Sequence, residues 1–165
     1  MNNFKLYLTT KIMSLIPETR GFGIKRRLLK WCGAHVGHNV RICSSARIIG
    51  CGQLSIGDNT WVGHQVLLVC SASIRIGANV NIAPRVIIGN GTHRITPQSD
   101  SIAGPGESYP VIIGDGCWIC TNANILCGSV IGEMSIVGAG AVYKAKSTVP
   151  HIVWGGIPAK VLKNV

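Results

Sequence analysis

The residues that could do chemistry in this chain of 165 residues are five histidines, seven cysteines and six carboxylates. The histidines are dispersed and the carboxylates are few, so the chain indicates no metal site. It has no Gly-x-Ser-x-Gly segment, the motif that positions the nucleophile of α/β-type serine hydrolases. His93 stands apart, because it lies in a long polar segment that cannot bury it. Imidazole exchanges a proton near neutral pH, so such a histidine is either a general base or an inert surface residue.

The cysteines predict no disulfide framework. Their number is odd, and Cys117 and Cys120 form a single Cys-x-x-Cys pair without a second pair at zinc-finger spacing. Small buried thiols in a reducing compartment explain such a set better. No apolar run approaches the roughly 18 residues of a membrane span, and no signal-peptide cleavage site follows the apolar stretch 6–16. We therefore expect a cytoplasmic protein.

The charge is strongly positive and unevenly distributed. Sixteen lysine and arginine residues against six acidic residues give a net charge of +10. Seven of the sixteen precede residue 31, and a small second group lies near the C-terminus: Lys144, Lys146, Lys160 and Lys163. Nucleic acid, an anionic membrane and phosphate-bearing small molecules are candidate partners for such a charge. Because no aromatic residues are interleaved with the basic ones and no known module accompanies them, we expect no nucleic-acid partner.

The composition disfavours both a disordered chain and an ordinary compact domain. Hydrophobic residues make up 47% of the chain, which is too many for intrinsic disorder. Aromatic residues make up only 5%, whereas glycine is abundant at 21 residues. Aromatic side chains usually dominate the bulk of a globular core. The composition therefore favours a chain that turns often and stacks small and β-branched residues.

A repeat of six residues runs through most of the chain. From Val36 onward an aliphatic residue recurs every six positions, often followed by glycine, with a small residue four positions later. Three hexads make one longer unit: the starts at Val36, Ile56 and Ile76 lie 20 residues apart, and those at Ile113 and Ile131 lie 18 apart. Such a nested period is typical of a repeat architecture.

Each hexad corresponds to one short strand and a turn. The aliphatic residue and the small residue point inward, and glycine, asparagine or aspartate permits the bend. Three such edges make a triangular coil, and stacked coils align their isoleucine and valine residues in ladders. One coil cannot bury its own apolar face, so several must stack. We therefore predict an all-β fold, a parallel β-solenoid.

Residues 1–35 do not follow the repeat. Their apolar residues predict two short helices, separated by Pro17 and the nearby glycines: Phe4, Leu8, Met13 and Leu15, then Ile24, Leu28, Leu29 and Trp31. We expect these helices to cap the first coil, because a solenoid needs capped ends. The alternative is that this basic cap makes peripheral contact with a membrane, which would place the protein at the inner face.

A second departure lies between Ile76 and Ile113, where the chain has 37 residues instead of the 20 of one coil. The excess is a polar, turn-rich excursion loop over about residues 89–110. Long loops in regular folds are usually functional or disordered. We divide the chain into a helical N-terminal cap (1–35), a β-helix with its excursion loop (36–148) and a C-terminal tail (149–165).

The hexads resemble those of the hexapeptide-repeat acyltransferase family, and the resemblance covers about residues 36–162. The segment Val137–Val142 (VGAGAV) and the segment Gly156–Lys160 (GIPAK) are similar to the last coil and tail of galactoside, maltose and polysaccharide O-acetyltransferases. The solenoid alone does not specify an activity. The loop histidine and the tail narrow the range of activities that the resemblance allows. The resemblance implies a left-handed parallel β-helix, a homotrimer and acetyl-CoA as co-substrate, without a metal.

The resemblance also assigns roles to single residues. His93 matches the loop histidine that deprotonates the acceptor hydroxyl, and Glu107 resembles the acidic residue that orients it. Trp118 and Thr121 match an aromatic wall and a backbone donor beside the thioester. The predicted coenzyme A contacts nearer the C-terminus are Gly138, Ala139, Gly140, Lys144, Gly156, Pro158 and Lys160, with Lys146 as a further phosphate partner.

The acceptor implied by the family is a saccharide or sugar nucleotide, and we expect His64, Gln65 and Tyr109 to line its site. An O-acetyltransferase of capsule, exopolysaccharide or other surface-glycan biosynthesis fits the short chain and the polar loop. Two alternatives stay open: an N-acetyltransferase of an amino sugar, nucleotide sugar or drug, and a non-catalytic solenoid that binds a membrane or a protein. In the family pattern, His93 of one subunit acts beside the coenzyme A groove of another.

Overall fold

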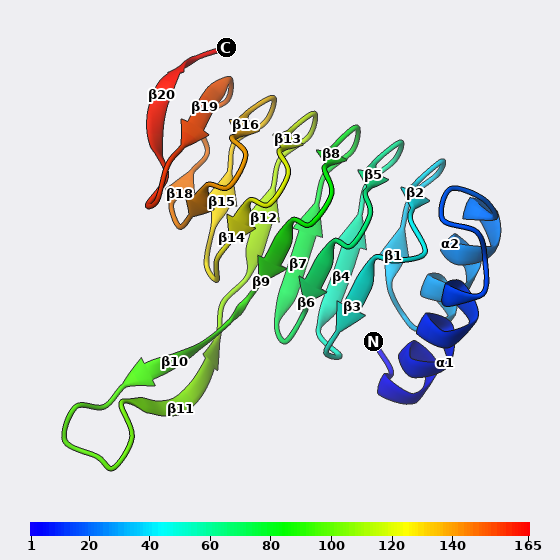
Figure 1. The fold of residues 1–165 in the computed structure, drawn as a ribbon, viewed down its shortest axis with the longest axis horizontal. Coiled ribbons are helices and arrows are strands. Elements are labelled where there is room, and N and C mark those ends of the chain that lie inside the picture. The colour runs from blue at the N-terminus through cyan, green and yellow to red at the C-terminus, as the bar shows by residue number, and fades with distance from the viewer.

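A computed structural model describes residues 1–165 and shows a three-sided parallel β-solenoid with two helices at its N-terminal end (Figure 1). The first sheet contains β1 (His35–Val36), β4 (Gln53–Ile56), β7 (Ser73–Ile76), β12 (Val111–Ile113), β15 (Val130–Ile131) and β18 (Lys146–Ser147). The second contains β2 (Arg41–Ile42), β5 (Trp61–Val62), β8 (Asn81–Ile82), β13 (Trp118–Ile119), β16 (Ile136–Val137), β19 (Ile152–Gly155) and β20 (Lys160–Asn164). The third contains β3 (Arg47–Ile49), β6 (Leu67–Val69), β9 (Ile87–Gly89), β14 (Asn124–Ile125) and β17 (Val142–Tyr143). The predicted solenoid is confirmed.

The register of the strands follows the repeat. Val36 pairs with Ile56, Ile56 with Ile76, Ile76 with Ile113 and Ile113 with Ile131. The long excursion between the third and fourth of these residues therefore leaves the stacking unchanged. All of these strands pair in parallel except β20, which folds back antiparallel to β19.

The core consists of one apolar ladder on each sheet, as the hexads predict. The second sheet contributes Ile42, Val62, Ile82, Ile119 and Val137, and every one of them is at most 2% exposed. At the C-terminal end Tyr143 meets Trp154 edge to face, with ring centroids 5.2 Å apart. Aliphatic ladders thus do the packing that aromatic side chains do in most domains, which explains the low aromatic content.

The corners explain the glycine and asparagine content. Asn39, Asn59 and Asn79 occupy equivalent corners of successive coils and adopt φ of 50°, 57° and 55°. This left-handed region is tolerated by asparagine better than by most residues. Gly57 is required for a different reason, because a Cβ atom on it would lie 2.5 Å from the backbone nitrogen of Ala78 in the next coil.

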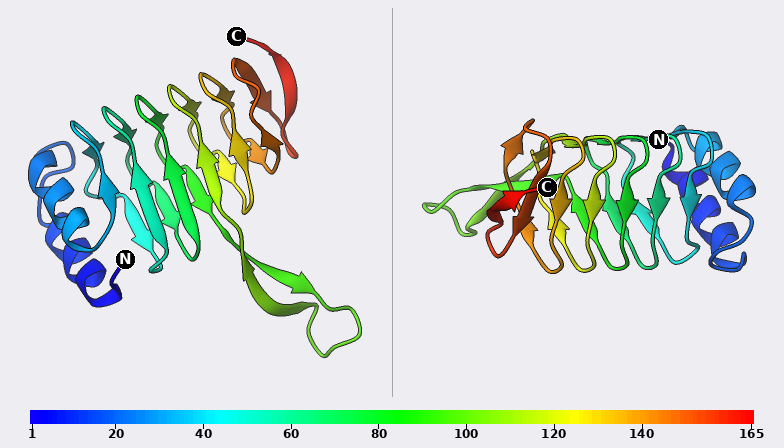
Figure 2. Two further views of the ribbon diagram at one scale, coloured as in Figure 1. Left: turned by 180° about the vertical axis from the view of Figure 1, so that it is seen from behind. Right: turned by 90° about the horizontal axis from the view of Figure 1, so that it is seen from above.

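The cap (residues 1–35) forms helices α1 (Asn3–Ser14) and α2 (Phe22–Trp31), as predicted. Asn2 begins α1 by accepting a hydrogen bond from the backbone N–H of Lys5. Helix α2 contacts β1 and β2, and α1 contacts β3, so together they cover the first coil (Figure 2).

The buried face of α1 contains only one of the apolar residues from which the helix was predicted, Met13. Its buried residues are Leu6, Thr9 and Met13, whereas Phe4 is 70% exposed. Helix α1 is apolar on both sides, and the sequence does not say which side meets the coil.

The excursion is a structured hairpin rather than an irregular loop. Strands β10 (Gly91–Ile95) and β11 (Ala103–Ser108) pair antiparallel and project sideways from the solenoid (Figure 1). We call residues 90–110 the arm. At its base Asn90 is fully buried, and its side chain accepts from the backbone N–H groups of Ser71 and Ala72 and donates to Ser73 O. These contacts fix the arm to the coil from which it leaves.

The seven cysteines are all free, in agreement with the expectation that they form no disulfide framework. Neither of the two helices has the length and apolar character that crossing a membrane requires.

The close approach at Gly57 makes a testable prediction. We expect Gly57→Ala to lower the free energy of unfolding by about 1–3 kcal/mol, because its methyl group would collide with backbone that cannot move independently. The matched control is Gly89→Ala, since a Cβ atom there meets nothing within 4 Å. Urea unfolding followed by circular dichroism measures both. Equal midpoints for the two variants would contradict the packing described.

Candidate active site

His93 lies on β10 at an exposed position of the arm. Its Nδ1 atom is 2.8 Å from the carbonyl oxygen of Gly104 on the opposite strand. A carbonyl oxygen can only accept, so in the neutral ring Nδ1 carries the proton and Nε2 keeps its lone pair. The arm therefore holds His93 in the tautomer that a general base needs.

Glu107 does not orient His93 in this chain, which corrects the expectation. In the pairing of β10 with β11, Glu107 is opposite Thr92, so its side chain lies on the other face of the ribbon from His93. Its carboxylate instead accepts from Arg94, at 2.7 Å and 2.9 Å, and from the hydroxyl of Tyr109 at 2.8 Å. The hydrogen bonds from Arg94 and then Tyr109 lower the pKa of Glu107, and the bond to Glu107 raises the pKa of Tyr109.

A cavity of about 690 Å³ lies where the base of the arm meets the later coils. That volume is typical of small-molecule sites, which span roughly 300–1,000 Å³. The arm contributes Thr92, His93, Arg94, Ile95, Glu107 and Tyr109, and the coils contribute Cys127, Gly128, Lys144, Ala145 and Lys146. The structure thus brings Glu107, Tyr109 and Lys144 together at the corner between the third and first sheets, and His93 borders the same cavity although its side chain lies on the other face of the ribbon from Glu107.

Other predicted residues gather at a different corner, between the second and third sheets. Thr121 O accepts a hydrogen bond from Gly140 N at 2.9 Å, and Gly138 N donates to Trp154 O at 2.7 Å. The backbone N–H of Thr121 makes no hydrogen bond within the chain, so it is free to donate to a ligand. Gly140 has φ of 67° with open space around its Cβ position, and Ala139 is exposed beside it. This corner can accept an extended ligand along its backbone.

The remaining predicted cofactor contacts lie beside this second group. Trp118 is 50% exposed on β13 and presents an aromatic face to solvent three residues before Thr121. Gly156 has φ of 95°, and its carbonyl accepts from Val142 N at 3.1 Å. Pro158 follows in the same turn, and Lys160 begins the exposed strand β20. Asn122 supplies the positive φ at this corner, 57°.

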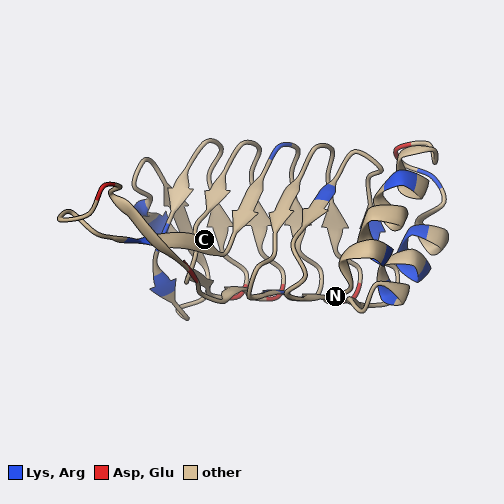
Figure 3. Ribbon diagram, turned by 90° about the horizontal axis from the view of Figure 1, so that it is seen from below, with Lys and Arg blue, Asp and Glu red and all other residues tan.

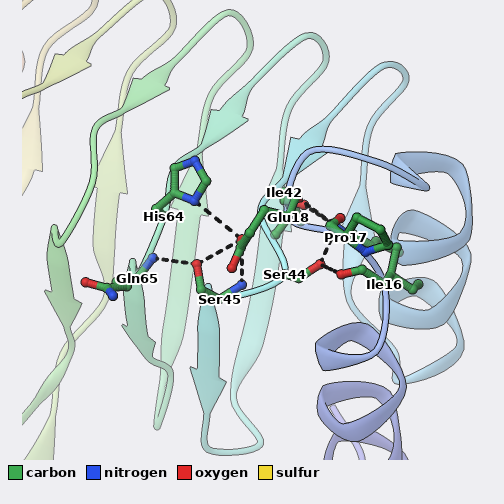
Figure 4. A network of polar contacts seen from close by, with 9 residues as sticks. Ile16, Pro17, Glu18, Ile42, Ser44, Ser45, His64 and Gln65 are labelled. Atoms are coloured by element: carbon green, nitrogen blue, oxygen red, sulfur yellow. Dashed lines mark hydrogen bonds and ion pairs between the residues drawn. The ribbon is translucent and has the colours of Figure 1, made fainter.

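His64 and Gln65 lie at the corner between the second and third sheets, near the N-terminal end of the solenoid and next to the cap (Figure 4). His64 Nδ1 is 3.4 Å from the carboxylate of Glu18, which also accepts from the N–H and hydroxyl of Ser45. The backbone N–H of Gln65 donates to Ser45 Oγ at 3.1 Å. In this chain the two residues join the linker between α1 and α2 to the coils, and they do not line the His93 cavity.

The same junction contains the buried cation Lys25. Its Nζ atom donates to the carbonyls of Pro17, Glu18 and Ile42, and burial lowers the pKa of Lys25. Ligand atoms of Glu18, Cys43 and His64 lie within 4.8 Å of one another, a spacing that is compatible with a metal ion. Because Lys25 already places a positive charge beside them, we assign this group to fastening the cap to the first coils.

Sequence reasoning missed Arg94 and the carbonyl of Gly104, the groups that hold Glu107 and His93. Both contacts depend on which residues the hairpin sets opposite each other, and the polar arm carries no apolar alternation that would reveal strands. The predicted site residues are divided in this chain: His93 lies on the arm, and the solvent-accessible backbone of Gly138–Gly140 lies with Trp118 and Thr121 at another corner.

Comparison with known proteins places this arrangement among acetyltransferases. The chain is 34% identical to the Escherichia coli K12 protein named as colanic acid biosynthesis acetyltransferase WcaF, over 83% of this chain and 72% of that protein. It is 29% identical to the galactoside O-acetyltransferase of Escherichia coli K12, over 86% of this chain and 68% of that enzyme. No protein-family model matches the chain.

The same grouping follows from solved structures. A hexapeptide-repeat-containing acetyltransferase from Vibrio cholerae, complexed with acetyl coenzyme A, matches with a TM-score of 0.71 at 25% identity. The match covers 96% of this chain and 86% of that chain. The solenoid is thus the left-handed parallel β-helix of these acetyltransferases.

The contacts of Glu107 predict its titration. We expect the Glu107 carboxyl to titrate below its usual pKa of 4.5, and Arg94→Met to move the pKa back up. The contacts favour the charged form, so their contribution to the arm is complete above about pH 4.5 and is lost as the pH falls through the lowered pKa. Carboxyl ¹³C NMR measures the shift. Arg85→Met is the matched control, because Arg85 bonds Gln65 at another corner. Titration of native Glu107 at or above 4.5 would contradict the contacts.

Proposed function

Because this chain belongs to the hexapeptide-repeat acetyltransferase family, we propose that it transfers the acetyl group of acetyl-CoA to a hydroxyl of a saccharide. The names of its relatives, which include a colanic acid biosynthesis acetyltransferase and a galactoside O-acetyltransferase, support an acceptor of this class. The proposed role is in the biosynthesis of a surface polysaccharide.

The observation that carries the proposal is the tautomer of His93. Its Nδ1–H is held by Gly104 O at 2.8 Å, so Nε2 is available to take a proton. A positioned histidine base contributes typically 10²- to 10⁴-fold in rate, on the order of what a sugar hydroxyl needs as a nucleophile. No other histidine of the chain has both an exposed position on the arm and a carbonyl partner of this kind.

The proposed reaction uses His93 twice. Nε2 accepts the proton of the acceptor hydroxyl while the oxygen forms a bond to the thioester carbonyl carbon. When the tetrahedral intermediate collapses, the C–S bond breaks and the imidazolium returns its proton to the coenzyme A sulfur. The acceptor leaves as an acetate ester and coenzyme A leaves as the thiol. The free N–H of Thr121 is the proposed donor to the developing oxyanion.

We assign acetyl-CoA to the groove formed by Gly138, Ala139 and Gly140. Its pantetheine would lie extended along this backbone, with Trp118 as an aromatic wall near the thioester. Gly156 and Pro158 shape the turn at the far end of the groove. Three exposed cations suit the phosphates of coenzyme A: Lys144, Lys146 and Lys160. Lys160 lies beside this groove, whereas Lys144 and Lys146 line the cavity at the arm corner and would reach coenzyme A held in the groove of a neighbouring subunit. The proposed chemistry draws on no metal.

We further propose that the active site forms between subunits of a homotrimer. In one chain the arm corner and the groove corner are separate, and the arm extends away from its own solenoid (Figure 2). A neighbouring solenoid packed beside the arm would bring its groove, with His64 and Gln65 on the same corner, to His93 and Tyr109 of the arm.

Replacing His93 tests the proposal. We expect His93→Ala to reduce turnover by about 100-fold or more, since the general base is removed, while acetyl-CoA binding persists. The assay follows coenzyme A release across a panel of saccharides and sugar nucleotides. His38→Ala is the matched control, because its side chain is exposed on a distant corner. Unchanged turnover of His93→Ala would refute the assignment. Acetylation confined to amino groups would show that the acceptor is an amine rather than a hydroxyl.

The lysine assignments make a separate prediction. We expect Lys160→Ala or Lys144→Ala to raise the KM for acetyl-CoA by roughly tenfold, as a charge-assisted contact to phosphate is lost. With acetyl-dephospho-CoA, which lacks the 3′-phosphate, the lysine that contacts this group should show no such effect. Lys163→Ala is the control, since that lysine lies outside the proposed groove. A KM unchanged in both variants would remove these lysines from the site.

A further inference from the structure

Helix α1 carries an apolar stripe on the side that faces away from the solenoid. Phe4, Leu8, Ile12 and Leu15 follow one another at spacings of four, four and three residues, so they lie along one face of the helix. Phe4 is 70% exposed, Ile12 42% and Leu15 85%. The side that meets the coil holds Leu6, Thr9 and Met13 instead. Leu8 is partly buried, but the ends of the stripe, Phe4 and Leu15, are left mostly in contact with solvent.

Helix α2 presents a similar outward face. Ile24 is 53% exposed and Trp31 is 47% exposed, and their spacing of seven residues brings both to one side of the helix. Lys5 of α1 lies over the ring of Trp31 with its Nζ atom 5.0 Å from the ring centroid, which joins the two helices on this side. We call these exposed apolar residues and the cations among them the outer face of the cap.

The charge of the outer face has one sign. The first 35 residues contain seven basic residues and one acidic residue, Glu18. Glu18 turns back to the coils, where it binds Ser45 and His64. Two of the cations are also used internally, since Lys25 and Arg26 donate to main-chain carbonyls. The five that remain are Lys5, Lys11, Arg20, Arg27 and Lys30, and Figure 3 shows the basic residues crowded on the two helices.

From this combination we infer that the outer face of the cap docks on an anionic lipid bilayer, with both helices lying in the plane of the surface. Apolar and aromatic side chains at helical spacing enter the interface, while lysine and arginine side chains meet the lipid phosphates. Tryptophan prefers this boundary, because one part of its ring system is apolar and its N–H is polar. The face lies at one end of the solenoid, so the coils do not obstruct contact with a flat surface (Figure 1). Acetyl transfer in solution does not require this contact.

Co-sedimentation of the purified full-length protein with vesicles tests the inference. We expect at least tenfold stronger partitioning to phosphatidylcholine vesicles with 30% phosphatidylglycerol than to vesicles of phosphatidylcholine alone. Raising the salt to 0.5 M should abolish most of this preference, because the electrostatic part is screened. The charge variant Lys11→Glu/Arg27→Glu and the apolar variant Phe4→Ser/Leu15→Ser should each lose at least tenfold in partitioning. These side chains are exposed, so circular dichroism and acetyl-CoA binding should stay unchanged.

The matched control is Leu162→Ser/Lys163→Glu, which makes the same kinds of change at exposed positions of the opposite end. It should bind vesicles as the unmodified protein does. Equal binding to neutral and anionic vesicles, or unchanged binding of the two cap variants, would overturn the inference. A change in the sedimentation coefficient of Phe4→Ser/Leu15→Ser without vesicles would also overturn it, because the face would then be covered by another copy of the chain.

Discussion

Every part of this structure depends on the stacking of one coil on the next in a fixed register. The inward residue of each hexad lies directly above its equivalent, as Val36, Ile56 and Ile76 do. Backbone hydrogen bonds and apolar contacts are therefore made together, and neither survives a slip of one residue. Gly57 shows how tight the stacking is, because even a methyl group would meet the backbone of the following coil. A solenoid of this kind gains stability from neighbours, coil by coil, rather than from a central core.

The solenoid places the two functions that the proposed reaction needs, binding of the acyl donor and proton transfer, on different parts of the chain. The corner with Thr121 and Gly140 is built from backbone held by coils on both sides, which suits a groove that must not move. The arm leaves the body between Ile88 and Val111 without changing the register, so its residues are free of the constraints of the ladders. Its order comes from local contacts: buried Asn90 at the base, the Arg94–Glu107 pair, and the bond from His93 to Gly104 O.

The repeat allowed the solenoid, its ladders and the place of the excursion to be predicted, because burial imposes the same choice at every sixth residue. Asn39, Asn59 and Asn79 mark the corners for a similarly simple reason. The arm's strands were not predictable in this way, since Ala103–Ser108 contains glycine and proline and buries nothing apolar. The contact of Glu107 with Arg94 could not be predicted from sequence spacing either, because the register of the hairpin decides which residues lie opposite each other. Helix α1 formed as predicted, but its buried side could not be read from the sequence, because Leu6 and Phe4 lie on opposite sides and hydrophobicity alone does not select the buried one.

The regular spacing of the coils also fixes the distance along the solenoid between the cap and the arm. Parallel strands lie about 4.8 Å apart, so the coil that carries the arm stands two such steps, or about 10 Å, above the coil that the cap covers. With the cap on a bilayer, the chemistry would occur at a set stand-off distance from the lipid headgroups. One additional coil of 20 residues would lift it by about 4.8 Å without altering any residue of the site. Coil number is thus a variable by which such proteins can match the reach of their acceptors.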